Sequence, residues 1–151
     1  MTDILGLRFD VPAGFQTDEV MLTLKGPEVD LKDPRMMQKQ QPVRANLIIH
    51  RRSVGGSPAL DMLCGEICAE LSSGVEGIQN LKTDAFQFAD GTAGRQVSFD
   101  FAVKHGAVRQ FQVMRLDGAM FTTLTLTVDP SHLNDRTQEA YFKALASVAA
   151  P

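Results

Sequence analysis

The sequence predicts an α+β protein in which one curved antiparallel sheet of about six to seven strands carries two helices on one face. Three observations support this fold class. Short segments alternate apolar and polar residues, as half-buried strands do. Two other segments repeat apolar residues at helical spacing. The strand-like segments of the second half are joined by tight turns, which pair neighbouring strands antiparallel.

The chain has the size and composition of one globular domain. It contains 151 residues, of which 44% are hydrophobic and 22% are charged, and both fractions are ordinary for a soluble protein. No internal repeat or composition shift divides the chain, so residues 1–151 are treated as a single domain. The net charge of −3 argues against a broad electrostatic interaction with nucleic acid or anionic lipid.

The sequence also predicts where the protein resides. No apolar run approaches the roughly 18–20 residues that cross a bilayer, so no stable membrane association is expected. The first residues lack the basic start and long apolar segment of a secretory signal. These features predict a cytoplasmic protein whose two cysteines stay reduced.

The first part of the chain contains three strand candidates and a long interruption. Residues 5–9 alternate apolar and polar positions, and residues 20–25 and 44–51 are the other two candidates. Residues 26–42 contain three prolines and mixed charge without any regular pattern. So long an irregular segment in a small domain is expected to be a mobile or functional loop.

Two segments are predicted to be helices. Residues 58–73 follow Ser57, a suitable N-cap, and begin with a proline, which fits the first helical position. The apolar stripe of this helix consists of Leu60, Leu63, Cys64, Ile67 and Leu71. The second helix covers roughly residues 135–148, where Asp135 and Gln138 are spaced like a capping box. Its buried stripe is formed by Tyr141, Leu145 and Val148.

Four strands are predicted between the two helices. They cover residues 81–88, 95–104, 108–116 and 120–128. The turn signals that separate them are Asp90-Gly91, His105-Gly106 and Asp117-Gly118. Loops this short connect antiparallel neighbours, so the four strands are expected to lie side by side in chain order.

The sequence contains no recognisable catalytic or metal-binding motif. Its glycines form neither a dinucleotide fingerprint nor a phosphate-binding loop, and the three histidines lie in separate segments. Cys64 and Cys68 share one side of the first helix, which indicates core cysteines. A nucleophilic cysteine with a distant histidine is the alternative. We therefore expect a protein that is not an enzyme, with no catalytic residue, metal or cofactor.

Alternation along the last two predicted strands indicates a binding surface. One set of positions suits a helix-covered core, namely Met120, Leu124, Leu126, Val128, Phe111 and Val113. The alternate set consists of Phe121, Thr123, Thr125, Thr127, Val108, Gln110, Gln112 and Met114. A face that mixes apolar side chains with Gln and Thr is suited to a partner. The alternative is that a dimer interface or the 26–42 loop covers it.

Four short segments of the chain resemble the DcrB-like proteins. They are Phe9-Asp-Val-Pro-Ala-Gly-Phe, the strand end Ile48-Ile-His-Arg, the pair Arg109-Gln110 and the run Thr122-Thr-Leu-Thr-Leu-Thr. Within that family the chain is most similar to the effector-associated (Eag) chaperones of bacterial type VI secretion, over about residues 5–148. Two departures are Phe15, where relatives often have Trp, and the longer 26–42 loop.

The resemblance implies a PsbP-like α+β fold and a homodimer whose curved sheets form an apolar groove. In this family the groove holds the hydrophobic N-terminal helices of an Rhs- or PAAR-containing effector before export, and the effector then reaches the secretion spike. Carried onto matching positions, the client-binding groove would consist of Val20, Leu22, Ile48, Val108, Gln110 and Phe121. The alternatives are a general protein-interaction module of PsbP-like fold and a small-ligand-binding protein that uses the same groove.

Overall fold

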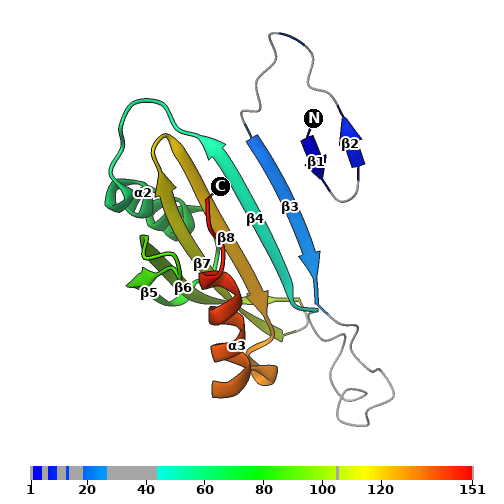
Figure 1. Ribbon diagram of the computed structural model, residues 1–151. Helices are drawn as coiled ribbons and strands as arrows, with labels where there is room; N and C mark the ends of the chain where they lie inside the picture. The colour runs from blue at the N-terminus through cyan, green and yellow to red at the C-terminus, as the bar shows by residue number, and fades with distance from the viewer. Residues whose placement is uncertain are drawn as a thin grey trace.

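The computed structural model describes residues 2–4, 7–9, 13, 19–26, 44–104 and 106–150. Within them lies a six-stranded antiparallel sheet of order β3-β4-β8-β7-β6-β5, so that β3 and β5 form its edges (Figure 1). Its strands are β3 (Glu19–Lys25), β4 (Asn46–Ser53), β5 (Gln79–Gln87), β6 (Ala93–Val103), β7 (Gly106–Asp117) and β8 (Met120–Val128). A separate two-stranded sheet pairs β1 (Thr2–Ile4) with β2 (Leu7–Phe9).

The predicted fold class is confirmed, because one antiparallel sheet is accompanied by two α-helices. These are α2 (Leu60–Gly74) and α3 (Asp135–Ala146), the latter preceded by the short 3-10 helix η1 (Pro130–His132). The predicted placement of both helices on one face is wrong. They lie on opposite faces of the sheet, with α3 in front and α2 behind in Figure 1.

Two hydrophobic clusters establish this arrangement. The residues of α2 pack with Val54, Val97, Phe99, Met114 and Phe121. The residues of α3 pack with Phe88, Phe111, Val113, Leu124, Leu126 and Val128. The two sets alternate in parity along β7 and β8, and successive side chains of a strand point to opposite faces. Each face of the sheet therefore has its own core and its own helix.

The strand register explains why two covering helices are needed. Phe99 of β6 lies opposite Gln110 of β7, whereas Phe111 of β7 lies opposite Leu126 of β8. Residues directly opposite each other in an antiparallel pair share a face. On one face of the sheet, the apolar residues of β6 therefore lie beside the glutamines of β7. The apolar residues of β7 and β8 lie on the other face.

The helix ends differ slightly from the predicted ones. α2 begins at Leu60, and its N-cap is Ala59, whose side chain makes no capping hydrogen bond, so the predicted Ser57 cap is wrong. α3 is capped by Asn134, whose side chain accepts from the backbone N–H of Thr137, in a reciprocal capping box. The capping box predicted from Asp135 thus lies one residue earlier in the chain.

Some predictions fall outside the described residues. Most of the 26–42 loop lies there, as do parts of the predicted strand over residues 5–9. Among the helices of the described ranges, none has the length and apolar character needed to span a membrane.

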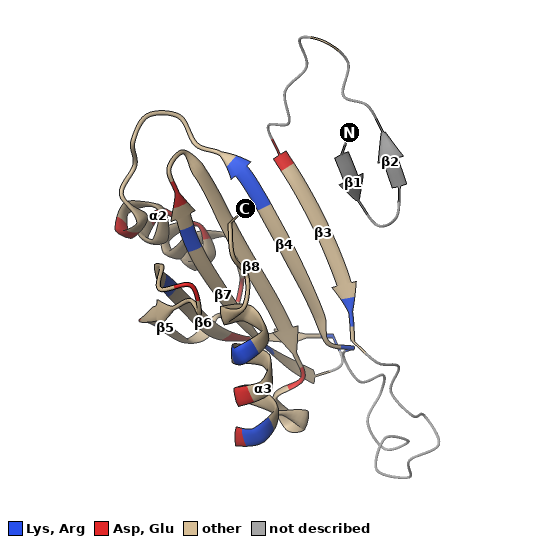
Figure 2. Cartoon of the chain, viewed as in Figure 1, with Lys and Arg blue, Asp and Glu red and all other residues tan. Residues whose placement is uncertain are grey.

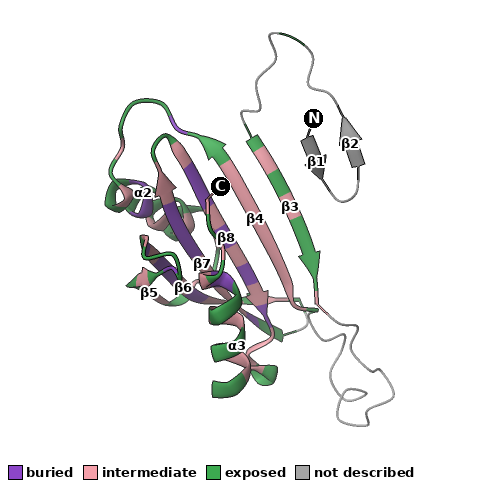
Figure 3. Ribbon diagram, viewed as in Figure 1, coloured by how far each residue is buried: buried purple, intermediate pink, exposed green. Residues whose placement is uncertain are grey.

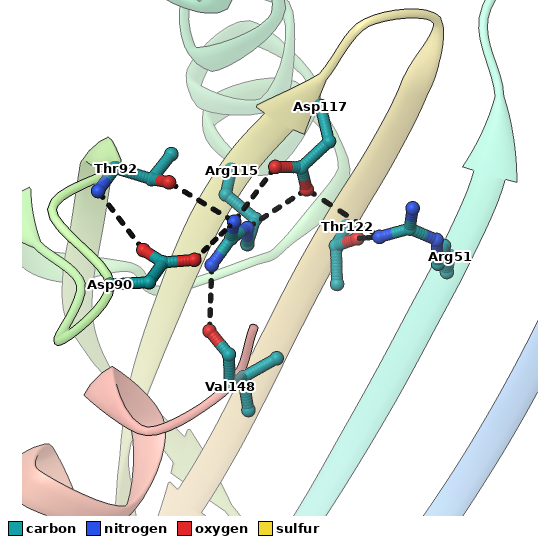
Figure 4. A network of polar contacts seen from close by, with 7 residues as sticks. All are labelled: Arg51, Asp90, Thr92, Arg115, Asp117, Thr122 and Val148. Carbon is teal, nitrogen blue, oxygen red and sulfur yellow. Dashed lines mark hydrogen bonds and ion pairs between the residues drawn. The ribbon is translucent and has the colours of Figure 1, made fainter. Parts of the chain in front are cut away.

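A buried cation connects α3 to the sheet (Figure 4). The side chain of Arg115, on β7, donates to the Asp117 carboxylate, to Asp90 Oδ2 at 2.8 Å and to the Val148 carbonyl at 2.6 Å. Its guanidinium also lies 4.7 Å from the centre of the Phe88 ring. Because Arg115 is only 1% exposed, these partners are what make its burial tolerable.

Candidate binding face of the sheet

α2 covers only part of its own face of the sheet, and the remainder is half-exposed. We call this remainder the open face, and it is formed by Met21, Thr23, Ile48, His50, Gln110, Gln112, Thr123, Thr125 and Thr127. Along β8, Thr123, Thr125 and Thr127 are half-buried while the leucines between them are buried beneath α3. Figure 3 shows this alternation on β8 and the more exposed character of the edge strand β3.

Cross-strand rows build the open face. Thr23, Ile48, Thr125 and Gln112 lie in one row that crosses four strands, β3, β4, β8 and β7. The neighbouring positions of β4 and β8 place His50 beside Thr123. β-branched residues fill the centre of this row, and such side chains pack well on a pleated surface. The open face is therefore a continuous surface with a fixed order of side chains.

The two glutamines of β7 are held in position by hydrogen bonds. Gln110 Nε2 donates to Thr127 Oγ1 at 3.0 Å, and Gln112 Nε2 donates to Gln110 Oε1 at 3.0 Å. This chain of bonds orients both amides along the sheet. A partner would meet donors and acceptors that are already ordered, which reduces the entropy lost on binding.

Formal charges lie at the ends of the open face. The carboxylate of Glu19 pairs with the His50 ring at one end of β3, and the Arg52 guanidinium lies 5.4 Å from the centre of the Phe121 ring. Figure 2 shows that β8 carries no charged residue and that the charges of β3 and β4 lie at strand ends. The middle of the open face is therefore uncharged but contains polar groups.

The structure separates the six predicted groove residues. Ile48 and Gln110 lie half-buried on the open face. Val20 and Leu22 also are half-buried, but they lie on the opposite face, since Leu22 is paired with Ile49.

Val108 and Phe121 are each only 2% exposed. Phe121 packs with Leu63 and Met114 beneath α2, because this helix lies on the face that the sequence had left open. The expectation that Phe121 and Val108 are accessible to a partner is therefore corrected. The binding role of the six residues stays a prediction.

Three residues of the open face were neither among the predicted groove residues nor in the alternate set of the last two strands. Met21, whose exposed fraction is 62%, and Thr23 come from the edge strand, and His50 comes from β4. Alternation within β3 could have separated Met21 from Val20 and Leu22. It could not tell which set shares a face with Ile48, because no short turn connects β3 to β4.

The two cysteines lie in the α2 core, as the sequence predicted. Cys64 is buried, Cys68 is half-buried, and neither forms a disulfide. Burial raises the pKa of the Cys64 thiol, with the neighbouring Cys68 adding to the effect. A thiol with a raised pKa is a poor nucleophile at neutral pH. In the part of the chain that the structure describes, no three His, Cys, Asp or Glu side chains are placed to hold a metal ion.

Comparison with known proteins supports the fold. No protein-family model matches the chain, and no curated protein sequence does either. A similar solved structure is that of the "Protein of Unknown Function PA94 from Pseudomonas aeruginosa, Putative Regulator". It aligns with a TM-score of 0.73 at 14% identity, over 99% of this chain and 95% of that chain. A likeness at this identity establishes a shared fold over almost the whole of both chains.

Proposed function

We propose that this protein is a cytoplasmic chaperone and adaptor for a type VI secretion effector. It binds the hydrophobic N-terminal helices of an Rhs- or PAAR-containing effector and keeps them out of water until the effector is loaded onto the secretion spike. The observation that supports this proposal is the open face, which is uncharged in the middle and combines Ile48 and Met21 with glutamine and threonine side chains.

The chemistry of the open face suits an apolar helix that carries a few polar groups. Burying apolar surface stabilises a complex by roughly 25 cal/mol per Å². Membrane-spanning helices also carry small polar residues at their packing faces. The amides of Gln110 and Gln112 and the hydroxyls of β8 can hydrogen-bond to those groups. No nucleotide is needed, because competition by the membrane or by the assembling spike can release the client.

A homodimer is part of the proposal. A single open face is bordered by the edge strand β3, and one narrow sheet cannot surround a helix. A second copy would supply the other wall of a groove. Light scattering at micromolar concentration is expected to give twice the mass of one chain, and a monomer would contradict this part of the proposal.

Co-purification with an effector fragment tests the proposal. The fragment is the N-terminal region of an effector encoded beside this protein, prepared with and without its hydrophobic helices. We expect capture of the longer fragment only, and loss of capture in Ile48→Asp. The matched control is Met62→Asp on α2, which places the same charge at a residue that is 51% exposed and outside the open face. Capture that survives Ile48→Asp, or that does not need the helices, would contradict the proposal.

A further inference from the structure

A polar cavity lies on the face of the sheet that carries α3, away from the open face. It has a volume of about 350 Å³ and lies over β5, β6 and β7. Its polar strand residues are Asn80, Lys82, Asp84, Gln96, Ser98, Asp100 and Arg109. α3 contributes Gln138 to the wall, and the Phe111 side chain lines the cavity as well. The volume lies in the range of small-molecule sites.

Register pairing places the charged and polar groups in three rows. Asp84 of β5 pairs with Gln96 of β6, and Lys82 pairs with Ser98. Asp100 pairs with Arg109 of β7. The rows follow from the alternation of β6, whose other side bears the apolar residues that contact α2. The polar side of β6 thus forms the floor of a cavity on the face opposite α2.

One wall of the cavity is a preformed ion pair. Arg109 Nε donates to Asp100 Oδ1 at 2.7 Å, and Arg109 Nη2 donates to Asp100 Oδ2 at 3.0 Å. This pairing, with a further hydrogen bond from Asn80 Nδ2 at 3.0 Å, lowers the pKa of Asp100. Asn80 makes that bond from a left-handed backbone conformation, with φ of 57°, next to an irregularity in the pairing of β5. The wall is therefore rigid and electrically neutral.

Three other groups in the cavity are not satisfied by the protein. Gln96 is only 9% exposed, and its side-chain amide makes no hydrogen bond to any residue that the structure describes. Within the described ranges neither Lys82 nor Asp84 forms a direct ion pair, although the charge of Lys82 helps to lower the pKa of Asp100. Among the described residues no polar side-chain atom is both sealed from solvent and without a partner, so the Gln96 amide opens into the cavity that it lines. An amide that reaches the cavity without a protein partner, beside the exposed Lys82 and Asp84, points to a ligand with complementary groups.

We propose that this cavity binds a zwitterionic dipeptide. Its carboxylate faces Lys82, its ammonium group faces Asp84, and its peptide group hydrogen-bonds with Gln96. Lys82 and Asp84 are two residues apart on one face of β5, which separates them by about 7 Å. The ends of an extended dipeptide are separated by about 7 Å as well. A ligand with a single charge could pair with Lys82 or with Asp84 but not with both.

An NMR titration tests the proposal with glycylglycine as the probe. We expect saturable shifts of the side-chain amide signals of Gln96 and Gln138. N-acetylglycylglycine lacks the ammonium group and glycylglycinamide lacks the carboxylate, and each is expected to bind at least about tenfold more weakly. Maltose serves as a larger, uncharged polar probe and is expected to cause no saturable shift.

Substitutions locate the binding in the cavity. Gln96→Leu, Lys82→Gln and Asp84→Asn are each expected to weaken glycylglycine binding by about tenfold or more. Lys82 and Asp84 are exposed, so these two variants should keep the amide spectrum of the folded protein even if Gln96→Leu does not. Gln112→Leu, the same change on the open face, is the matched control and should bind normally. Absence of saturable shifts, equal binding of the blocked dipeptides, saturable binding of maltose, or binding unaffected by all three variants would overturn the proposal.

Discussion

Arg115 and Asp117 lie two residues apart on β7 and form a two-point ion pair. Arg115 Nε donates to Asp117 Oδ2 at 2.8 Å, and Arg115 Nη2 donates to Asp117 Oδ1 at 2.7 Å. Asp117 Oδ2 also lies 3.5 Å from Nη1 of Arg51, which donates to Thr122 at 3.0 Å (Figure 4). One carboxylate thus joins β4 and β7, and through Arg115 it also holds the chain that follows α3.

Asp117→Asn should destabilise the protein. The change removes the charge that compensates the buried Arg115, and breaking such a pair costs more than losing a surface ion pair. Asp117 is itself partly exposed. We therefore expect the free energy of unfolding to fall by roughly 2–3 kcal/mol, which lies between the cost of breaking a surface ion pair and that of breaking a fully buried one. Urea denaturation measures it. Asp61→Asn is the control, because the ion pair of Asp61 with Arg95 lies at the surface, and its loss should be about 1 kcal/mol or less.

Acid should weaken the fold through the same network. The hydrogen bond from the Thr92 backbone, followed by those from the Arg115 and Thr92 side chains, lowers the pKa of Asp90 from 3.8 to about 2. The Arg115 hydrogen bond also lowers the pKa of Asp117. A carboxylate with a lower pKa in the folded state stabilises that state above the unfolded pKa. This stabilisation is fully present above about pH 5 and is lost as the pH falls from about 4 toward 2. Thermal melts between these pH values should show the loss, and Asp117→Asn should reduce its size. A melting temperature that does not fall on acidification would contradict the assignment.

Charges at Ile48 and Phe121 should have different effects. Phe121→Asp places a carboxylate in the α2 core, where an unpaired charge is strongly unfavourable, so this variant should not fold. Ile48→Asp places it on the half-exposed open face and should leave a cooperative melt. Circular dichroism separates the two outcomes. A folded Phe121→Asp variant would show that α2 does not cover this residue in solution.

Gly94 should not tolerate a side chain. A Cβ atom there would lie 2.5 Å from the Phe88 ring and 2.6 Å from the Met114 carbonyl oxygen. Gly94→Ala should therefore destabilise the protein by roughly 1–3 kcal/mol, the usual effect of overpacking. Gly65→Ala on α2 is the matched control, because a Cβ at that position has nothing within 4 Å. It should be neutral or stabilise by up to about 1 kcal/mol, since alanine favours helix. Chemical denaturation of both variants gives the comparison.

The sequence contains more information about the faces of the sheet than alternation alone provides. The short connection between β6 and β7, which pairs Val103 with Gly106, places Phe99 on the same side as Gln110. The turn at Gly118-Ala119 places Phe111 on the same side as Leu126. Combining the two turns predicts apolar surfaces on opposite faces, and therefore a helix on each. The assumption of a single helix layer led to the wrong placement of Phe121.

The remaining parts of the binding face depend on long-range packing. Ile48 and Gln110 could be predicted because they alternate with obvious core positions. The burial of Phe121 could not, because alternation identifies a face but does not say how far a helix extends over it. Which side chains of β3 point to the open face depends on the long connection between β3 and β4, whose register no short turn sets. A slip of one residue in the pairing would place Leu22 on the open face instead of Met21.

Under the proposed function, β8 determines how a client can be accommodated. Thr123, Thr125 and Thr127 belong to the open face, while Leu124 and Leu126 on the other side of the strand are packed into the α3 core. A close-packed core resists displacement, so the middle of the sheet cannot bend or slide to follow the shape of a bound helix. Adjustment is left to movement of the edge strand β3. Clients of different sequence would then share one depth and direction of binding and differ only in the contacts that they make at that edge.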